Sequence, residues 1–120
     1  MSKGYVLGKR SLDRLVGIDP KLVAVVKRAI EISEIDFTVV EGVRTLETQK
    51  LYLKRGVTQT LSSKHITGDA VDLGAWINGT VSWAEEYYYE IADSMRIAAL
   101  ELGVGIRWRW MLAWRLETFL

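Results

Sequence analysis

The spacing of the apolar residues changes along this chain, and this change constrains the fold more than any other feature. Between residues 21 and 33 apolar side chains recur every three to four positions, whereas between residues 69 and 76 they alternate in part with small or polar ones. The first spacing is typical of an amphipathic helix and the second of a strand with one buried face. Because both patterns occur in one short chain, we expect an α+β fold with helices packed on a sheet.

Two helices should supply most of the helical core. Asp19-Pro20 marks the start of the first, because Asp can accept hydrogen bonds from free amides and Pro suits a first turn. The spacing of Ser82 and Glu85 is that of a capping box, so the second helix should run from about residue 83 to 102 and stop at Gly103. The expected buried faces comprise Leu22, Val25, Val26, Ala29 and Ile30 in the first helix, and Ile91, Met95, Ala98 and Ala99 in the second.

Three segments are predicted to form strands, namely residues 36–40, 69–76 and 104–108. Between the first two strands, Thr45 can cap a helix over residues 46–55, and a polar loop should follow over residues 57–64. Asn78-Gly79 predicts a tight turn after the second strand. The expected sheet is therefore small and mainly antiparallel.

The length and composition exclude several classes of protein. With 120 residues, 49% of them hydrophobic and 26% charged, we expect a single globular domain over residues 1–120. The formal net charge of +1 gives no reason to expect a nucleic-acid partner. The chain has no Cys, so any bound metal must be held by His and carboxylate side chains.

No targeting or membrane segment is visible in the sequence. The short apolar run Tyr5-Val6-Leu7 is soon followed by Lys9 and Arg10, so it does not resemble a signal peptide. No window approaches the roughly 18 consecutive apolar residues of a membrane span. We expect no export signal, no stable membrane insertion and a cytosolic protein.

His65 and Asp72 are the first candidates for chemistry. His65 is the single histidine of the chain, and Asp72 follows it by seven residues, beyond a glycine at which the chain can turn. Neutral imidazole and ionised carboxylate are both good ligands for zinc. Taken alone, this spacing is weak evidence, since a histidine near an aspartate is common by chance.

The surrounding residues make the signal specific. The pattern Ser63-x-His65-x-x-Gly68-x-Ala70-x-Asp72 resembles the signature of the LAS-type zinc peptidases. These enzymes include D-alanyl-D-alanine carboxypeptidases and phage endolysins that cleave the L-alanyl-D-glutamate bond of peptidoglycan. Residues 11–23 and 36–45, followed by Gln49 and Gly56, also resemble the endolysins, so that the resemblance extends from about residue 7 to 107. It implies the LAS-type, D,D-peptidase-like fold.

The resemblance also implies roles for individual residues. His65 and Asp72 would be ligands of Zn²⁺, and Ser63 would support them through hydrogen bonds. Arg44 would hold a substrate carboxylate or the developing oxyanion, and Gln49 would help to orient the same region. The implied mechanism is attack of a zinc-polarised water on a peptide carbonyl, with a carboxylate as the general base.

The end of the chain departs from the family. Related enzymes carry a late histidine as the third zinc ligand, with an acidic base shortly before it, and neither is identified in the atypical tail, residues 108–120. Codons read one base later from Trp108 can encode the Gly, Cys, Asp and Trp that the family has there. We hypothesise that a one-base frameshift replaced the natural end, and we expect weaker zinc binding than in a three-ligand site.

Three readings of the function follow. The leading one is a phage endolysin, a zinc peptidase that cleaves bacterial peptidoglycan, with its activity impaired by the altered C-terminus. We expect it to act as a monomer and to stay in the host cytoplasm until a holin opens the membrane. The second is a catalytically inactive peptidoglycan-binding module. The third is a D-alanyl-D-alanine carboxypeptidase, which would share the site and differ in the peptide end that it holds.

Overall fold

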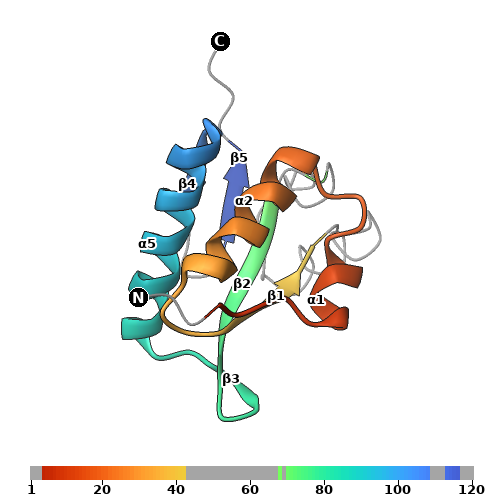
Figure 1. Ribbon diagram of the computed structural model, residues 1–120. Coiled ribbons are helices and arrows are strands. Elements are labelled where there is room, and N and C mark those ends of the chain that lie inside the picture. The colour runs from red at the N-terminus through yellow and green to blue at the C-terminus, as the bar shows by residue number, and fades with distance from the viewer. Residues whose placement is uncertain (1–3, 43–67, 69, 109–112, 117–120) are drawn as a thin grey trace, which may run out of the picture.

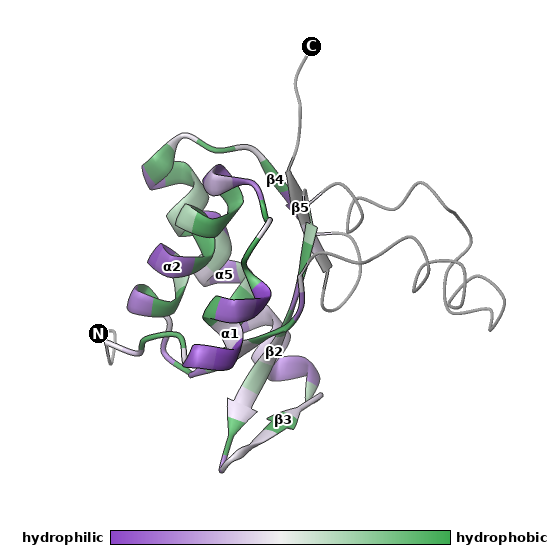
Figure 2. Cartoon of the chain, turned by 90° about the vertical axis from the view of Figure 1, so that its right-hand side faces the viewer, coloured by the Kyte–Doolittle hydropathy of each residue, from purple (hydrophilic) through white to green (hydrophobic). Residues whose placement is uncertain are grey.

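The computed structural model describes residues 4–42, 68, 70–108 and 113–116 of the chain. In this part, a single antiparallel sheet is covered on one face by helices, which Figure 1 shows from the front and Figure 2 from the side. The fold class predicted from the sequence is therefore confirmed. The elements in chain order are α1 (Lys9–Arg14), α2 (Pro20–Ile32), β1 (Phe37–Glu41), β2 (Ala70–Ile77), β3 (Thr80–Ser82), α5 (Glu85–Leu102), β4 (Ile106–Trp108) and β5 (Ala113–Leu116).

Strand β2 is the centre of the sheet. The strand order is β1-β2-β5-β4, and the short β3 also pairs with β2. Along one edge β2 pairs with β1, with Thr38 opposite Gly74. Along its other edge β2 pairs first with β5, through residues 70–72, and then with β3, through residues 75–77. Every one of these pairs is antiparallel, as the sequence predicts.

Helices α2 and α5 lie side by side on the covered face of the sheet (Figure 1). The alternation along β1 and β2 turns five apolar side chains toward them, and all nine predicted helical core residues are indeed buried. The surfaces that meet in this core are supplied by Phe37, Val39, Val71, Leu73 and Ala75 from the sheet, and by Leu22, Val25, Val26, Ala29, Ile30, Ile91, Met95, Ala98 and Ala99 from the helices.

The ends of the two long helices test the predicted caps. Asp19 Oδ1 accepts a hydrogen bond from the Lys21 amide at 2.8 Å, so the predicted start of α2 is confirmed. Gly103 ends α5 in the left-handed conformation, at φ 66°, also as predicted. The predicted capping box is wrong, because Ser82 belongs to β3 and α5 begins at Glu85, with Ala84 at the N-cap position and no side-chain cap.

Helix α1 was not predicted, and it closes the outer edge of β1. The Ser11 hydroxyl accepts a hydrogen bond from the Val39 amide at 3.0 Å, and Arg14 donates to the Val39 carbonyl at 2.9 Å. These backbone groups point away from β2, so α1 satisfies the polar groups that an edge strand would leave open. With six residues and one buried side chain, Ser11, the helix has too little apolar pattern to be recognised from sequence.

Strand β5 was not predicted either, and it places part of the tail inside the sheet. Trp114 is buried, with 2% of its surface exposed, and stacks on Trp108 with ring centroids 5.9 Å apart. The rings of Tyr89, in α5, and Trp108 pack edge to face, with their centroids 6.0 Å apart. Trp114 is therefore part of the core of the described structure. The frameshift hypothesis concerns the gene and stays a prediction, as does the single domain over residues 1–120.

The predicted helix over residues 46–55 and the loop over residues 57–64 lie outside the described residues. The turn at Asn78-Gly79 is confirmed, since both residues have positive φ angles, 53° and 79°, between β2 and β3. No helix in the described ranges is long and apolar enough to cross a membrane.

Candidate functional site

We call the face of the sheet opposite α2 and α5 the open face, because no helix of the described residues covers it. It carries the one predicted site residue that lies within the described part of the chain. Asp72 is in the middle of the sheet, between β1 and β5. Its neighbours Val71 and Leu73 are buried beneath the helices, with 0% and 1% of their surfaces exposed. Because side chains alternate along a strand, Asp72 projects from the opposite face, where it is half-buried.

A bulge in β1 brings a second carboxylate to the same end of the sheet. Val39 pairs with Leu73 and Glu41 pairs with Asp72, so Val40 is the extra residue. Strict alternation would put Glu41 on the covered face with Val39, but the bulge moves it to the face of Asp72. Sequence analysis did not single out Glu41, because a bulge depends on strand pairing and has no signal in the sequence itself.

The glycine of the predicted motif has a definite structural role. Gly68 has a φ of 80°, which favours glycine, and its carbonyl accepts a hydrogen bond from the Asp19 amide at 2.9 Å. A Cβ at this position would collide with the Gly17 carbonyl. Gly68, four residues before Asp72, therefore packs on the connection between α1 and α2.

Gly42 docks the end of β1 in a similar way. A Cβ there would collide with the carbonyl oxygen of Arg14, at the end of α1. Both glycines belong to segments that resemble the endolysins, and each packs against backbone within residues 11–23, a third such segment. The described ends of two of these segments, Gly42 and Gly68, therefore both pack on the backbone of the third.

The other predicted site residues lie outside the described residues. Ser63, His65, Arg44 and Gln49 all fall between residues 43 and 67, so their roles stay predictions. Within the described ranges, no three or more His, Cys, Asp or Glu side chains are grouped so that they could hold a metal ion. The described part of the site thus offers two carboxylates, Asp72 and Glu41. Carboxylates suit zinc, but two residues are fewer than the three protein ligands typical of a catalytic site.

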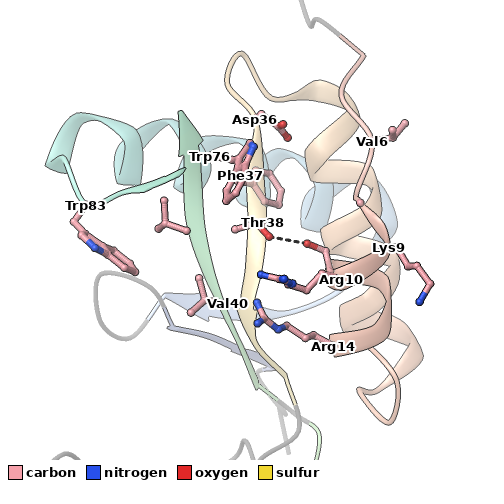
Figure 3. A pocket seen from close by; sticks show the side chains of 13 residues that line it. Val6, Lys9, Arg10, Arg14, Asp36, Phe37, Thr38, Val40, Trp76 and Trp83 are labelled. Carbon is pink, nitrogen blue, oxygen red and sulfur yellow. Dashed lines mark hydrogen bonds between the residues drawn. The ribbon is translucent and has the colours of Figure 1, made fainter. Parts of the chain in front are cut away.

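A groove lies between α1 and the open face of the sheet. Its volume is about 660 Å³, and Figure 3 shows it from close by. Arg10 and Arg14 reach into it from α1, whereas Trp76 and Trp83 come from β2 and from the segment after β3. We call this the α1 groove, and define it by Arg10, Arg14, Thr38, Val40, Trp76 and Trp83. The α1 groove was not predicted from the sequence, because the residues that line it come from separate segments of the chain.

One carboxylate lines the α1 groove. Asp36 immediately precedes β1, and partial burial raises its pKa above the usual value, although a hydrogen bond from the Phe37 amide opposes this. Its carbonyl accepts a hydrogen bond from the Trp76 amide at 3.0 Å, which extends the pairing of β1 with β2 by one residue. Three cationic residues, Lys9, Arg10 and Arg14, outnumber this carboxylate in the lining.

Comparison with known proteins supports the expected family. Residues 3–118 match the family model described as phage L-alanyl-D-glutamate peptidase. The L-alanyl-D-glutamate peptidase of Escherichia phage T5 is 36% identical over an alignment of 107 residues, and the match covers 86% of this chain and 78% of that protein. The crystal structure of the Serratia marcescens L-Ala D-Glu endopeptidase ChiX matches with a TM-score of 0.89 at 36% identity, over 96% of this chain and 92% of that one.

Proposed function

Because this chain belongs to the family of phage L-alanyl-D-glutamate peptidases, we propose that it is an endolysin-type zinc peptidase that cleaves the L-alanyl-D-glutamate bond of bacterial peptidoglycan. The observation that carries the proposal is the match to two peptidases of this specificity, each 36% identical and each aligned over most of its length. Residues 3–118, which match the family model, include the sheet that holds Asp72 and the helices beneath it, and this makes a peptidoglycan hydrolase the best-supported function.

His65 and Asp72 are the proposed holders of the metal. Zinc bound there would polarise a water molecule and the scissile carbonyl. Asp72 is suited to the role because it lies on the central strand β2, which is paired at this position with β1 on one side and β5 on the other, so its backbone is held in place. Ser63 would fix the ligands through hydrogen bonds, as the family resemblance implies.

Arg44 and Gln49 are the proposed substrate residues. A guanidinium can hold a peptide carboxylate with two parallel hydrogen bonds, or stabilise negative charge on the carbonyl oxygen. Gln49 would orient the same part of the substrate. Arg44 follows the docked Gly42 by two residues, so the packing of Gly42 on α1 fixes where the segment with Arg44 leaves β1.

Glu41 is our candidate for the general base. The family supplies this carboxylate from the end of the chain, where none was identified here, whereas the bulge in β1 sets Glu41 opposite Asp72. A carboxylate in this place can take a proton from the attacking water. Glu41→Gln should then lower the rate of hydrolysis about 100-fold or more and leave the muropeptide products unchanged. Wild-type rates in this variant would rule out Glu41 as the base.

Two alternative functions, a catalytically inactive binding module and a D-alanyl-D-alanine carboxypeptidase, can be distinguished from the proposed one by the products that the protein releases. Purified peptidoglycan incubated with the protein and zinc should yield muropeptides cut between L-alanine and D-glutamate, as identified by mass spectrometry. A catalytically inactive binding module would bind the sacculi and release nothing. A D-alanyl-D-alanine carboxypeptidase would release D-alanine alone.

The setting of the reaction is part of the proposal. A phage peptidase of this kind would stay in the host cytoplasm until a holin opens the membrane, and would then reach the cell wall as a monomer. Expression in bacteria tests this directly, since the protein should lyse cells when it is expressed with a holin and should not when it is expressed alone.

A further inference from the structure

The α1 groove has a chemistry that matches one side of the substrate. We propose that it binds the part of the stem peptide that begins with D-glutamate, through the carboxylates that this part carries. The inference rests on the proposed function and adds to it a binding site for the segment that leaves after cleavage.

The α1 wall of the groove is cationic. Arg10 is exposed and makes no ion pair or hydrogen bond within the described residues, so its guanidinium is available to a ligand. Arg14 donates to the Val39 carbonyl through one terminal nitrogen, Nη1, which anchors its side chain at the outer edge of β1. Figure 3 shows both arginines directed from α1 toward the sheet. An anchored guanidinium next to an available one favours an anionic ligand.

The sheet side of the groove is apolar and aromatic. Trp76 and Trp83 expose 41% and 55% of their surfaces, which is unusual for large rings that the fold could bury. Val81 and Val40 pack over Gly74, since a Cβ there would approach them at 2.9 and 3.0 Å, and they add aliphatic surface beside Trp83. The groove therefore suits a ligand with aliphatic spacers between its charged groups.

The groove and Asp72 share one face of β2. Gly74 and Trp76 follow Asp72 by two and four residues, so all three project from the open face. At a rise of about 3.3 Å per residue, these positions lie roughly 7 and 13 Å along the strand from Asp72. This is the length of about two to four extended peptide residues. A peptide cleaved at Asp72 can therefore reach the groove without a bend.

The free carboxylates of the substrate lie on one side of the L-alanyl-D-glutamate bond. On the L-alanine side, the amino group is acylated by the sugar-linked lactyl group, so this side has no free carboxylate. On the other side, D-glutamate uses one of its two carboxyl groups to continue the chain and keeps the other, and the stem ends in a further carboxylate. Only the D-glutamate side complements the two arginines.

Binding of the product peptide tests the proposal without any need for catalysis. The tripeptide D-γ-Glu-L-Lys-D-Ala should shift the indole N–H resonances of Trp76 and Trp83 in ¹H–¹⁵N spectra of the full chain. Arg10→Ala should raise the Kd by about tenfold, the usual size of one charge-assisted contact. The matched control is Arg96→Ala, an exposed arginine on α5 that pairs with Asp93, and it should leave the Kd unchanged.

Three results would overturn the proposal: no shift at either indole, equal binding of a tripeptide amidated at both free carboxylates, or stronger binding of neutral N-acetylchitobiose, which would assign the groove to the glycan. Retained dispersion of the other resonances shows that each variant is folded. Hydrolysis is measured separately, so binding without cleavage would contradict the proposed function alone, and cleavage without binding would contradict the groove alone.

Discussion

The two faces of the sheet differ in what they bury and in how regular they are. The covered face is apolar, and no side-chain nitrogen or oxygen that is buried within the described residues lacks a hydrogen-bond partner. The open face carries Asp72 and Glu41, a bulge, and two tryptophans that are about half exposed. Since β2 contributes to both faces, the alternation of one strand separates the residues that stabilise the fold from those that can act on a substrate.

This difference predicts that neighbouring substitutions in β2 have separable effects. A change on the covered face should lower stability, and any loss of activity should follow from unfolding. A change on the open face should alter activity or binding and leave the free energy of unfolding nearly unchanged.

Leu73→Ala should have the largest effect on stability. Leu73 is 1% exposed and packs beneath the helices, so the substitution should lower the free energy of unfolding by about 3 kcal/mol through lost burial and a cavity. Urea denaturation followed by circular dichroism measures this. Asp72→Asn is the matched control one residue away, with an expected change under about 1 kcal/mol. Equal losses in the two variants would contradict the separation of the faces.

Gly68→Ala should have an intermediate effect, because Gly68 links the motif to the α1–α2 connection. An alanine would have to adopt a positive φ, and its Cβ would collide with the Gly17 carbonyl. Together these effects should lower the free energy of unfolding by about 2 kcal/mol. Thermal unfolding of the variant measures the loss. Gly79→Ala is the control, since it also has a positive φ, 79°, but open space around it, so it should be affected less. A smaller loss at Gly68 than at Gly79 would refute the docking role.

The ion pair between the two long helices should give the smallest effect, and one that depends on pH. Arg28 donates to Glu101 at 2.7 Å, and this contact lowers the pKa of the Glu101 carboxyl. A carboxyl with a lowered pKa stabilises the fold above its unfolded pKa and loses this contribution as pH falls through its folded pKa. Glu101→Gln should therefore slightly lower the Tm at pH 7 and leave it unchanged at pH 2. Both side chains are substantially exposed, so salt should weaken the difference.

Features that depend on local sequence could be predicted. The start of α2 at Asp19-Pro20, the turn at Asn78-Gly79 and the end of α5 at Gly103 each follow from the conformational preferences of one or two residues. The buried faces of α2 and α5 follow from their apolar spacing. Each of these features is determined by interactions within a few residues, so it does not depend on contacts with distant parts of the chain.

Features that depend on pairing between distant segments could not be predicted. Helix α1 is held by contacts of Ser11 and Arg14 with Val39, more than 20 residues away. Strand β5 forms between β2 and β4 and pairs with both. Helix α5 begins later than the predicted capping box because Ser82 is the last residue of β3. In each case a tertiary contact decides the local structure.

The same distinction applies to the site. Asp72 was found because its motif is contiguous in the sequence, and the family was identified from short segments of the same kind. Glu41 was missed because the bulge in β1 exists only once β1 pairs with β2. The α1 groove was missed because Arg10, Trp76 and Trp83 are close in space but distant along the chain.

The most direct test of the account is digestion of purified peptidoglycan, with zinc present, by the wild-type chain and by Asp72→Asn. The account predicts new D-glutamate amino ends from the wild type, and a rate at least 100-fold lower from a variant whose unfolding curve is unchanged. Release of D-alanine alone, or equal rates from the two proteins, would contradict it.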